Sequence, residues 1–403
     1  MSIADVAENK SSAPAIDYPA VSLISFGHTF NDLSGNFMTS LTPYLVLRGE
    51  ISLTLAGFVL LVYLIASSIL QPIFGLLSDR TGRRIFVVAS PLWVGTAAAL
   101  FGLAGNAGIL LILVAIGGVG SAAFHPQAAS MVDGLSKLRK GWTMSLFSMG
   151  GNIGFALGPV AAAVAALVGL HWSLVYVLPA ICLSLLLFLR APAPPVANQL
   201  FSFKDLSRAV RKARRGLGGV VGVIALRSGA QFALILLLPL YMHARGFSPQ
   251  LGSYYAFVLS VAGAGGGLLG GRLSDRYGRR IVVVGSLLLS APLLGLVLVT
   301  SSWLVWPLLV FAGVALLASN SVTVVQGQEL LPASTGIASG LTLGFAFGLA
   351  GVLTTALTSM SAHTGVGTAI AVVPALPVIA ALFALFVPET ARRMGALQTE
   401  HDV

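Results

Sequence analysis

The chain has 403 residues, of which 56% are hydrophobic and only 9% are charged, and its mean hydropathy is +0.92. Soluble domains carry roughly 25% charged residues, so this composition excludes a water-soluble fold. The formal net charge is +10, which would suit a nucleic-acid partner if the basic residues were clustered on a soluble surface.

Apolar stretches of about twenty residues recur along the whole chain, and each is long enough to cross a bilayer as a helix. Their continuous apolar runs exclude the alternating pattern of a membrane β-barrel. The sequence therefore predicts an all-α integral membrane protein with twelve transmembrane helices. The expected spans are 21–47, 52–77, 84–104, 107–133, 141–168, 172–190, 217–244, 250–272, 281–300, 303–328, 335–360 and 365–388.

The basic residues are distributed unevenly between the two sides of these spans. Twenty of the 23 Lys and Arg residues fall in one set of alternate loops and the two tails, whereas Arg48 and Arg245 fall in the opposite loops. By the positive-inside rule, the basic loops and both termini face the cytoplasm. Insertion and anionic lipid headgroups account for the basic excess, so no nucleic-acid partner is expected.

The first span contains polar residues within an otherwise apolar helix. Five residues at steps of three or four share one face of it: His28, Asp32, Gly35, Thr39 and Thr42. A carboxylate within a bilayer is costly unless it is solvated, paired or protonated. We therefore expect this face to border a cavity in which Asp32 and His28 carry protons and Asn31 contacts a substrate. The alternative is a permanent pairing that only ties helices together.

The fourth span contains His125, one turn after Ser121 and directly before Pro126, whose missing N–H frees a backbone carbonyl. Prolines in membrane helices are tolerated where a cavity or a neighbour satisfies that carbonyl. His125 is therefore expected to contact the substrate, as is Asn320 on the tenth span. A hydrogen-bonded interior histidine is the alternative.

An internal repeat divides the chain. GLLSDRTGRR at 75–84 returns as GRLSDRYGRR at 271–280, an offset of 196 residues that is close to half the chain. The two halves are separated by a segment with a Pro-rich start and a basic end. The expected organisation is a cytoplasmic tail (1–20), a six-helix bundle (21–190), a cytoplasmic linker (191–216), a second six-helix bundle (217–388) and a cytoplasmic tail (389–403).

The same offset maps Asn31 onto Arg227, a strong cation within the seventh span. An arginine cannot shed its charge, so it must meet an anion. The candidates are a phosphonate or carboxylate substrate, which its forked donors bind bidentately, and Asp32 of the other half. Gln231, one turn further along, is expected to contact the substrate from the same face.

Two related halves around a central site are a known transporter plan. The repeated G-x-x-x-D-R-x-G-R-R motif resembles the loop signature of the major facilitator superfamily. Longer stretches such as HTFNDLSGNF, GSAAFHPQAAS and FSMGGNIGFALGP are similar to its fosmidomycin resistance branch. The resemblance implies two pseudo-symmetric six-helix bundles, alternating access, export of a drug-like anion in exchange for protons, and a monomer.

The repeated loops combine acids and bases, which predicts a conformational role at the cytoplasmic face. Acids at the ends of the fourth and tenth spans are expected to pair with loop arginines in one access state and to release them in the other. Surface pairs that only signal topology are the alternative. The predicted gating residues are Asp79, Arg80, Arg83, Arg84, Asp133, Asp275, Arg276, Arg279, Arg280 and Glu329.

These features predict a non-enzymatic secondary transporter of the bacterial inner membrane. The expected activity is proton-coupled antiport that exports a small anionic or amphipathic compound, such as a fosmidomycin-like phosphonate. An uptake symporter for an organic anion and a non-transporting membrane sensor are the alternatives. The single cysteine and the missing H-E-x-x-H, Walker and G-x-S-x-G motifs predict no metal and no cofactor.

Overall fold

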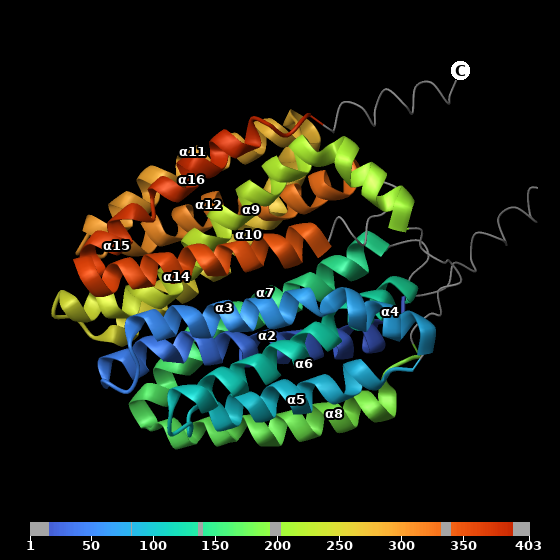
Figure 1. The fold of residues 1–403 in the computed structure, drawn as a ribbon, viewed down its shortest axis with the longest axis horizontal. Helices are drawn as coiled ribbons and strands as arrows, with labels where there is room; N and C mark the ends of the chain where they lie inside the picture. Colours follow the sequence, from blue (N-terminus) through green and yellow to red (C-terminus); the bar gives the residue numbers. More distant parts are fainter. Residues whose placement is uncertain (1–15, 82, 136–139, 194–202, 332–339, 390–403) are drawn as a thin grey trace, which may run out of the picture.

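A computed structural model of the chain describes residues 16–389, except for 82, 136–139, 194–202 and 332–339. Every regular element among these residues is a helix (Figure 1). In chain order, the helices are α2 (Tyr18–Leu47), α3 (Leu53–Ile69), α4 (Gln71–Thr81), α5 (Ile85–Phe101), α6 (Ala107–Gly134), α7 (Lys140–Val168), η1 (Leu170–Tyr176), α8 (Val177–Arg190), α9 (Phe203–Ala244), α10 (Pro249–Tyr277), α11 (Arg279–Val299), α12 (Val305–Leu330), η3 (Gly340–Phe345), α14 (Ala346–Thr364), α15 (Val366–Val372) and α16 (Ala375–Ala384).

These helices form the twelve predicted spans in the predicted order, because four pairs of shorter helices each make one span. The pairs are α3 with α4, η1 with α8, η3 with α14, and α15 with α16. Among the described residues, nine segments are long and apolar enough to cross a membrane, and Ile85–Phe101 is a shorter apolar helix. Their lengths and composition confirm the predicted all-helical membrane fold.

Local sequence sets the helix ends. The side chain of Asp17 accepts a hydrogen bond from the backbone N–H of Ala20 at 3.0 Å, so α2 begins inside the predicted tail. Ser52 and Asn106 cap α3 and α6 in the same way. The glycines at 49 and 246 adopt positive φ in the equivalent turns after α2 and α9, where a side chain would be strained.

The seventh span begins earlier than predicted. Helix α9 starts at Phe203, inside the predicted linker 191–216, and runs without interruption to Ala244. Its first turns are rich in Arg and Lys and lie at the right-hand end of the upper group of helices, in lime in Figure 1. Of the predicted linker and tails, residues 1–15, 194–202 and 390–403 lie outside the described residues, and the domain boundaries stay a prediction.

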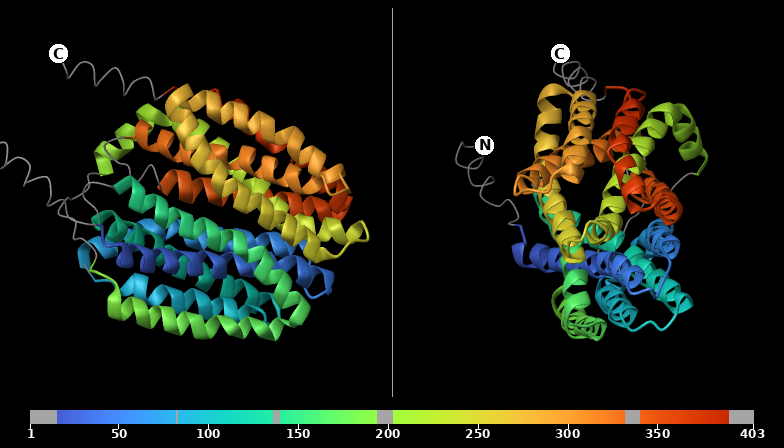
Figure 2. Two further views of the ribbon diagram at one scale, coloured as in Figure 1. Left: turned by 180° about the vertical axis from the view of Figure 1, so that it is seen from behind. Right: turned by 90° about the vertical axis from the view of Figure 1, so that its left-hand side faces the viewer.

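The described core divides between the two halves of the chain. One cluster of buried apolar side chains is drawn from α2 to α8 and the residues beside them, and the others are drawn from the second half. Leu60 and Leu64 of α3 are buried within a second-half cluster, and partly buried first-half residues such as Tyr63 and Phe155 pack against it. The two groups of helices lie one above the other in Figure 1, and both views of Figure 2 show the same division.

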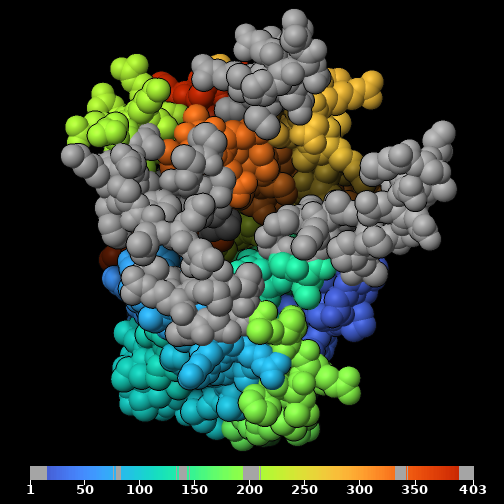
Figure 3. All heavy atoms as spheres, turned by 90° about the vertical axis from the view of Figure 1, so that its right-hand side faces the viewer, coloured from blue at the N-terminus to red at the C-terminus, as the bar shows by residue number. Residues whose placement is uncertain are grey.

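Among the described residues, two hydrogen bonds join the halves at the end opposite the repeated basic loops. The hydroxyl groups of Tyr44 on α2 and Ser253 on α10 lie 2.7 Å apart. The hydroxyl of Thr355 on α14 donates to the Gly57 carbonyl on α3 at 2.9 Å. Figure 3 views the molecule from the basic end and shows a hollow between the described parts of the two halves. The described parts of the two halves are therefore joined at one end and separated by a hollow at the other.

Candidate functional site

The polar face of α2 carries a cluster of two imidazoles and one carboxylate. Nε2 of His28 lies 3.2 Å from Oδ2 of Asp32, four residues along the helix. Nε2 of His125 on α6 lies 3.2 Å from Oδ1 of the same carboxylate. The Asp32 and His125 side chains are 20% and 26% exposed, so the cluster is not sealed from its surroundings. The structure thus brings His125 to the His28–Asp32 pair that the sequence placed on one face of the first span.

Backbone carbonyls hold the other nitrogen of each ring. Nδ1 of His28 lies 2.8 Å from the Phe147 carbonyl on α7, and Nδ1 of His125 lies 2.8 Å from the Ser121 carbonyl. A carbonyl oxygen only accepts, so Nδ1 must be the protonated nitrogen of each ring in these contacts. In the neutral form, each ring then turns an unprotonated Nε2 toward Asp32.

Glycines on α7 allow α2 to approach closely enough for these contacts. A Cβ on Gly151 would lie 2.9 Å from Oδ2 of Asp32 and would collide with the His28 ring. A Cβ on Gly154 would collide with the Thr29 carbonyl, and the Thr29 hydroxyl donates to the Gly150 carbonyl at 2.9 Å. The small residues therefore allow a close crossing that positions the polar face of α2.

Asn31 faces the interior of the first half. It is fully buried, and its amide donates to Oδ1 of Asp32 at 3.1 Å and to the Ser121 hydroxyl at 3.2 Å. These bonds orient the carboxylate. A direct contact between Asn31 and substrate stays a prediction.

Tyr63 on α3 belongs to the same neighbourhood, and sequence reasoning missed it. Its hydroxyl bonds to Ser121 and interacts electrostatically with Asp32. A Cβ on Gly35 would collide with the Tyr63 hydroxyl, so this α2 glycine leaves room for the phenol. Tyr63 lies in a continuous apolar run, where no sequence signal separates a site tyrosine from a packed one.

The second half buries a guanidinium at the position related by the repeat. Arg227 on α9 is 1% exposed and donates to the Ser228 hydroxyl and to the Asn320 side-chain oxygen on α12, both at 2.9 Å. Its Nε has no hydrogen-bond partner, and no described acid forms an ion pair with it. Gln231, one turn further along α9, is also buried. The predicted group of Arg227, Gln231 and Asn320 therefore lies on two neighbouring helices.

The considered ion pair between Arg227 and Asp32 does not form in this arrangement. Asp32 is engaged by the two histidines, and Arg227 by a hydroxyl and an amide oxygen. Helices α2 and α9 pack against each other, but each charged group finds its partners within its own half. A charge paired only with neutral acceptors retains most of its attraction for an anion.

Three of the predicted gating residues meet at the end of the second half. Arg279 contacts both carboxylate oxygens of Glu329, at 2.8 Å from Nη2 to Oε1 and 2.9 Å from Nε to Oε2. Nη1 of Arg279 lies 3.2 Å from Oδ1 of Asp275. The group lies within one half, on α10, α11 and α12, while the halves are parted at this end. Release of Glu329 in another state stays a prediction.

Glu389 completes this end of the molecule. Its carboxylate accepts from the backbone N–H groups of Arg279 and Arg280, both at 3.0 Å, and so caps the first turn of α11. Gly278 precedes this turn with φ of 96°, which explains the glycine in the second copy of the motif. The guanidinium of Arg276 lies over the Tyr277 ring, 5.2 Å from its centroid.

The matching loop of the first half is described in part. Gln127 on α6 donates to the Ser78 hydroxyl and to the Arg83 carbonyl, both at 2.8 Å, and accepts from the Val87 N–H. Arg84 donates to the Ala191 carbonyl. The side chains of Asp79, Arg80 and Asp133 lie outside the described residues, so their predicted pairing is untested.

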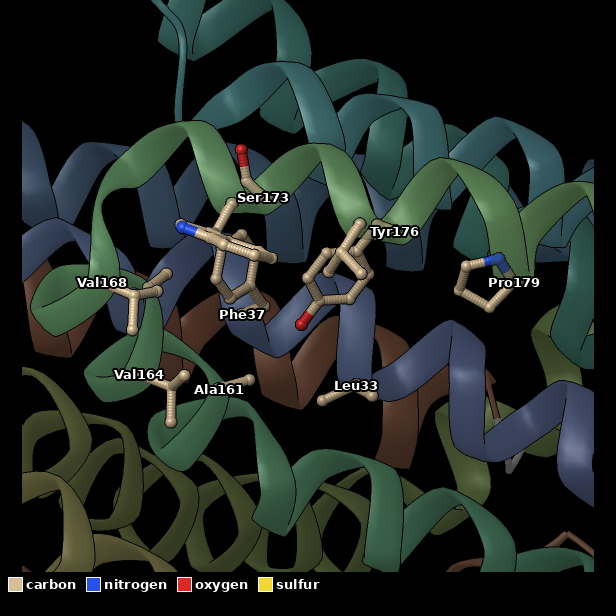
Figure 4. Close-up of a pocket in the computed structure, with 11 residues that line it drawn as sticks. Leu33, Phe37, Ala161, Val164, Val168, Ser173, Tyr176 and Pro179 are labelled. Carbon is tan, nitrogen blue, oxygen red and sulfur yellow. The ribbon is translucent and has the colours of Figure 1, made fainter.

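An apolar cavity of about 370 Å³ lies elsewhere, between α2, α7 and η1 (Figure 4). Leu33, Phe37, Val164 and Tyr176 are among its lining residues, and its walls contain almost no polar surface. Val164 is itself exposed, as expected for a surface that faces lipid. Neither the histidine cluster nor Arg227 borders this cavity.

The sequence predicted no metal site. Among the described residues, the ligand atoms of His28, Asp32 and His125 all lie within 4.8 Å of one another, close enough to surround an ion. The two contacts of 3.2 Å are, however, hydrogen-bond distances that protons alone can satisfy. We therefore treat the group as a hydrogen-bonded cluster.

The chain resembles known proteins over nearly its whole length. Residues 24–355 match the model of the Major Facilitator Superfamily. The fosmidomycin resistance protein of Escherichia coli (strain K12) is 29% identical over 375 residues, covering 91% of this chain and 92% of that protein. An uncharacterized transporter of the same superfamily, YfnC of Bacillus subtilis (strain 168), is 29% identical with the same coverage.

Solved structures show the same fold at low sequence identity. A bacterial homologue of the human lysosomal transporter Spinster, in an inward-facing and unoccupied conformation, superposes with a TM-score of 0.74 and 17% identity, covering 94% of this chain and 98% of that one. The nucleoside transporter NupG gives 0.72 at 16% identity, covering 92% and 100%. The match to the family model covers most of the chain, and this protein therefore belongs to the Major Facilitator Superfamily, a family of membrane transporters of small molecules.

Proposed function

We propose that this transporter exports a small anionic or amphipathic compound, of which fosmidomycin-like phosphonates are the favoured class, by proton-coupled antiport. It acts as a monomer in the bacterial inner membrane with both termini in the cytoplasm. Arg227, Gln231 and Asn320 bind the anion, and the His28–Asp32–His125 cluster, oriented by Asn31, binds the coupling protons.

The burial of Arg227 is the observation that carries the proposal. An arginine within the membrane stays charged, and its forked donors match the oxygens of a phosphonate or carboxylate. In this arrangement it has neutral partners and an unpartnered Nε. A bound anion would supply the missing charge and the missing acceptor. The relative's name, fosmidomycin resistance protein, supports the phosphonate class and the outward direction.

Coupling arises because protonation and substrate binding each have different free energies in the two access states. The charges also favour a second candidate, uptake by symport. An anion at Arg227 and protons at the cluster attract each other, so the same two sites could load together. Antiport requires instead that loading one site weakens loading of the other.

Purified protein in liposomes with a trapped pH dye tests the proposal. Fosmidomycin added to vesicles with an imposed proton gradient is expected to move protons opposite to itself, and Asp32→Asn is expected to abolish that movement. Asp17→Asn, outside the bundle interior, is the matched control that should retain it. Protons moving with the substrate would establish symport. No flux with fosmidomycin or a panel of organic anions would overturn the proposed function.

A further inference from the structure

We infer that the His28–Asp32–His125 cluster carries two exchangeable protons, one on Nε2 of each imidazole, with Asp32 as the carboxylate that bridges them. The inference rests on the proposed function. The transported protons then reside on the two histidines, whereas the sequence predicts Asp32 and His28 as the proton carriers.

The backbone contact of each ring sets its tautomer. Because Nδ1 of His28 and of His125 donates to a backbone carbonyl, each neutral ring has only a lone pair at Nε2. Both Nε2 atoms point at carboxylate oxygens of Asp32, which also carry lone pairs. Two lone pairs at 3.2 Å repel, so each contact needs one proton to be attractive.

The number of protons follows from the number of contacts. The fully deprotonated cluster leaves both contacts repulsive, and one proton satisfies only one of them. Two protons satisfy both, which is the arrangement that two equal distances of 3.2 Å describe. An imidazole is a stronger base than a carboxylate, so the protons reside on the two nitrogens and Asp32 stays ionised.

The groups that face the cluster do not change this count. On α6, Ser121 is a hydroxyl, and α7 contributes Gly151 and a backbone carbonyl. On α3, the Tyr63 hydroxyl is the remaining titratable group beside Asp32, and it already bonds to Ser121. Arg227 on α9 does not pair with Asp32, and its donors engage Ser228 and Asn320.

The doubly protonated cluster has a net single positive charge. This charge lies on α2 and α6 of the first half, whereas Arg227 lies on α9 of the second half.

The proton stoichiometry of transport tests the inference. Vesicles are held at zero membrane potential, a pH gradient is imposed, and the fosmidomycin gradient at which net flux vanishes is measured. Each coupled proton adds a tenfold substrate gradient per pH unit. Wild type is expected to balance about a 100-fold gradient at one pH unit, and His28→Asn or His125→Asn about a 10-fold gradient. His363→Asn, an exposed histidine near the end of α14, is the matched control and should behave as wild type.

The outcomes are distinct from those for the proposed function. If the wild type couples transport to protons but net flux vanishes at about a 10-fold fosmidomycin gradient, the two-proton cluster is overturned while proton-coupled transport stands. The two-proton cluster is also overturned if both histidine variants balance the same fosmidomycin gradient as the wild type.

Nitrogen NMR of histidine-labelled protein in detergent measures the protonation of each ring nitrogen without a transport assay. The His28→Asn and His125→Asn variants assign the signals. Two rings with both nitrogens protonated support the inference. A neutral ring, or a ring protonated at Nε2 alone, for either residue at neutral pH overturns it.

Discussion

At the residue scale, the site combines groups that are costly in a membrane and are stabilised in different ways. Asp32 has two imidazole partners and the Asn31 amide, so its charge is compensated locally. Arg227 has hydroxyl and amide oxygens but no acid. The charge of Asp32 is compensated without a ligand, whereas a bound anion would compensate the charge of Arg227.

Substitution of Arg227 tests the anion site directly. Arg227→Gln is expected to weaken binding of a phosphonate by about 30-fold or more, since loss of a buried charged partner costs about 2 kcal/mol or more. Arg227→Lys keeps the charge but loses the bidentate geometry of the guanidinium, so a smaller loss of phosphonate affinity is expected. Equilibrium binding of radiolabelled fosmidomycin in detergent measures both. Equal binding by wild type and Arg227→Gln would contradict the assignment.

Glu389 offers a second residue-scale test, of stability. Glu389→Ala removes the acceptor for two backbone N–H groups at the start of α11 and is expected to lower the free energy of unfolding by about 1 kcal/mol. Glu50→Ala, in an exposed pair with Arg48 at 3.9 Å, is the control and should change it by less than about 0.5 kcal/mol. Thermal unfolding in detergent compares the two, and equal midpoints would argue against the capping role.

At the element scale, the crossing of α2 and α7 positions the histidine cluster. Side chains of α2 bond to α7 carbonyls at three levels: His28 to Phe147, Thr29 to Gly150, and Asn36 to Phe155. These bonds require the two backbones to be close, and glycines on α7 provide the space.

A methyl group at the crossing is expected to be destabilising. Gly154→Ala places a Cβ against the Thr29 carbonyl and should cost about 1–3 kcal/mol, because a helix backbone cannot rotate away as a side chain can. A Cβ on Gly285 of α11 meets no atom within 4 Å, so Gly285→Ala is the control, with a neutral or slightly stabilising effect. Thermal midpoints in detergent measure both variants. A neutral Gly154→Ala would show that the helices are not in tight contact there.

At the scale of the whole molecule, the halves are joined away from the basic loops and parted beside them. Transport by alternating access requires the joined end to open and the parted end to close. The Glu329–Arg279 pair lies within one half, so it braces that half at the parted end. The hydrogen bonds of Tyr44 and Thr355 are among the contacts that must then break.

A reversible cross-link tests that motion. Cysteines at Tyr44 and Ser253, in a Cys182→Ser background, are treated with a short thiol-reactive cross-linker that contains a cleavable disulfide, because a cysteine is shorter than the tyrosine whose hydroxyl lies 2.7 Å from Ser253. The cross-link is expected to join the halves and to reduce transport to background. Reduction of the cross-link should restore transport. Each single cysteine variant is the control, and transport that continues in the cross-linked protein would show that this contact persists throughout the cycle.

The sequence by itself determined the membrane fold, the twelve spans and the repeat, because these depend on local hydropathy and on motifs within one stretch of chain. It also marked His28, Asp32, His125 and Arg227, since charged and imidazole groups are conspicuous in apolar helices.

Only the tertiary structure decided which of these groups meet. His28 and His125 are 97 residues apart, and their shared contact with Asp32 depends on how α2, α6 and α7 pack. The same packing pairs Arg227 with Asn320 and leaves it apart from Asp32, and it brings Tyr63 beside the cluster. Helical periodicity fixes which residues share a face, but the facing helix is chosen by packing, through small residues that allow close approach.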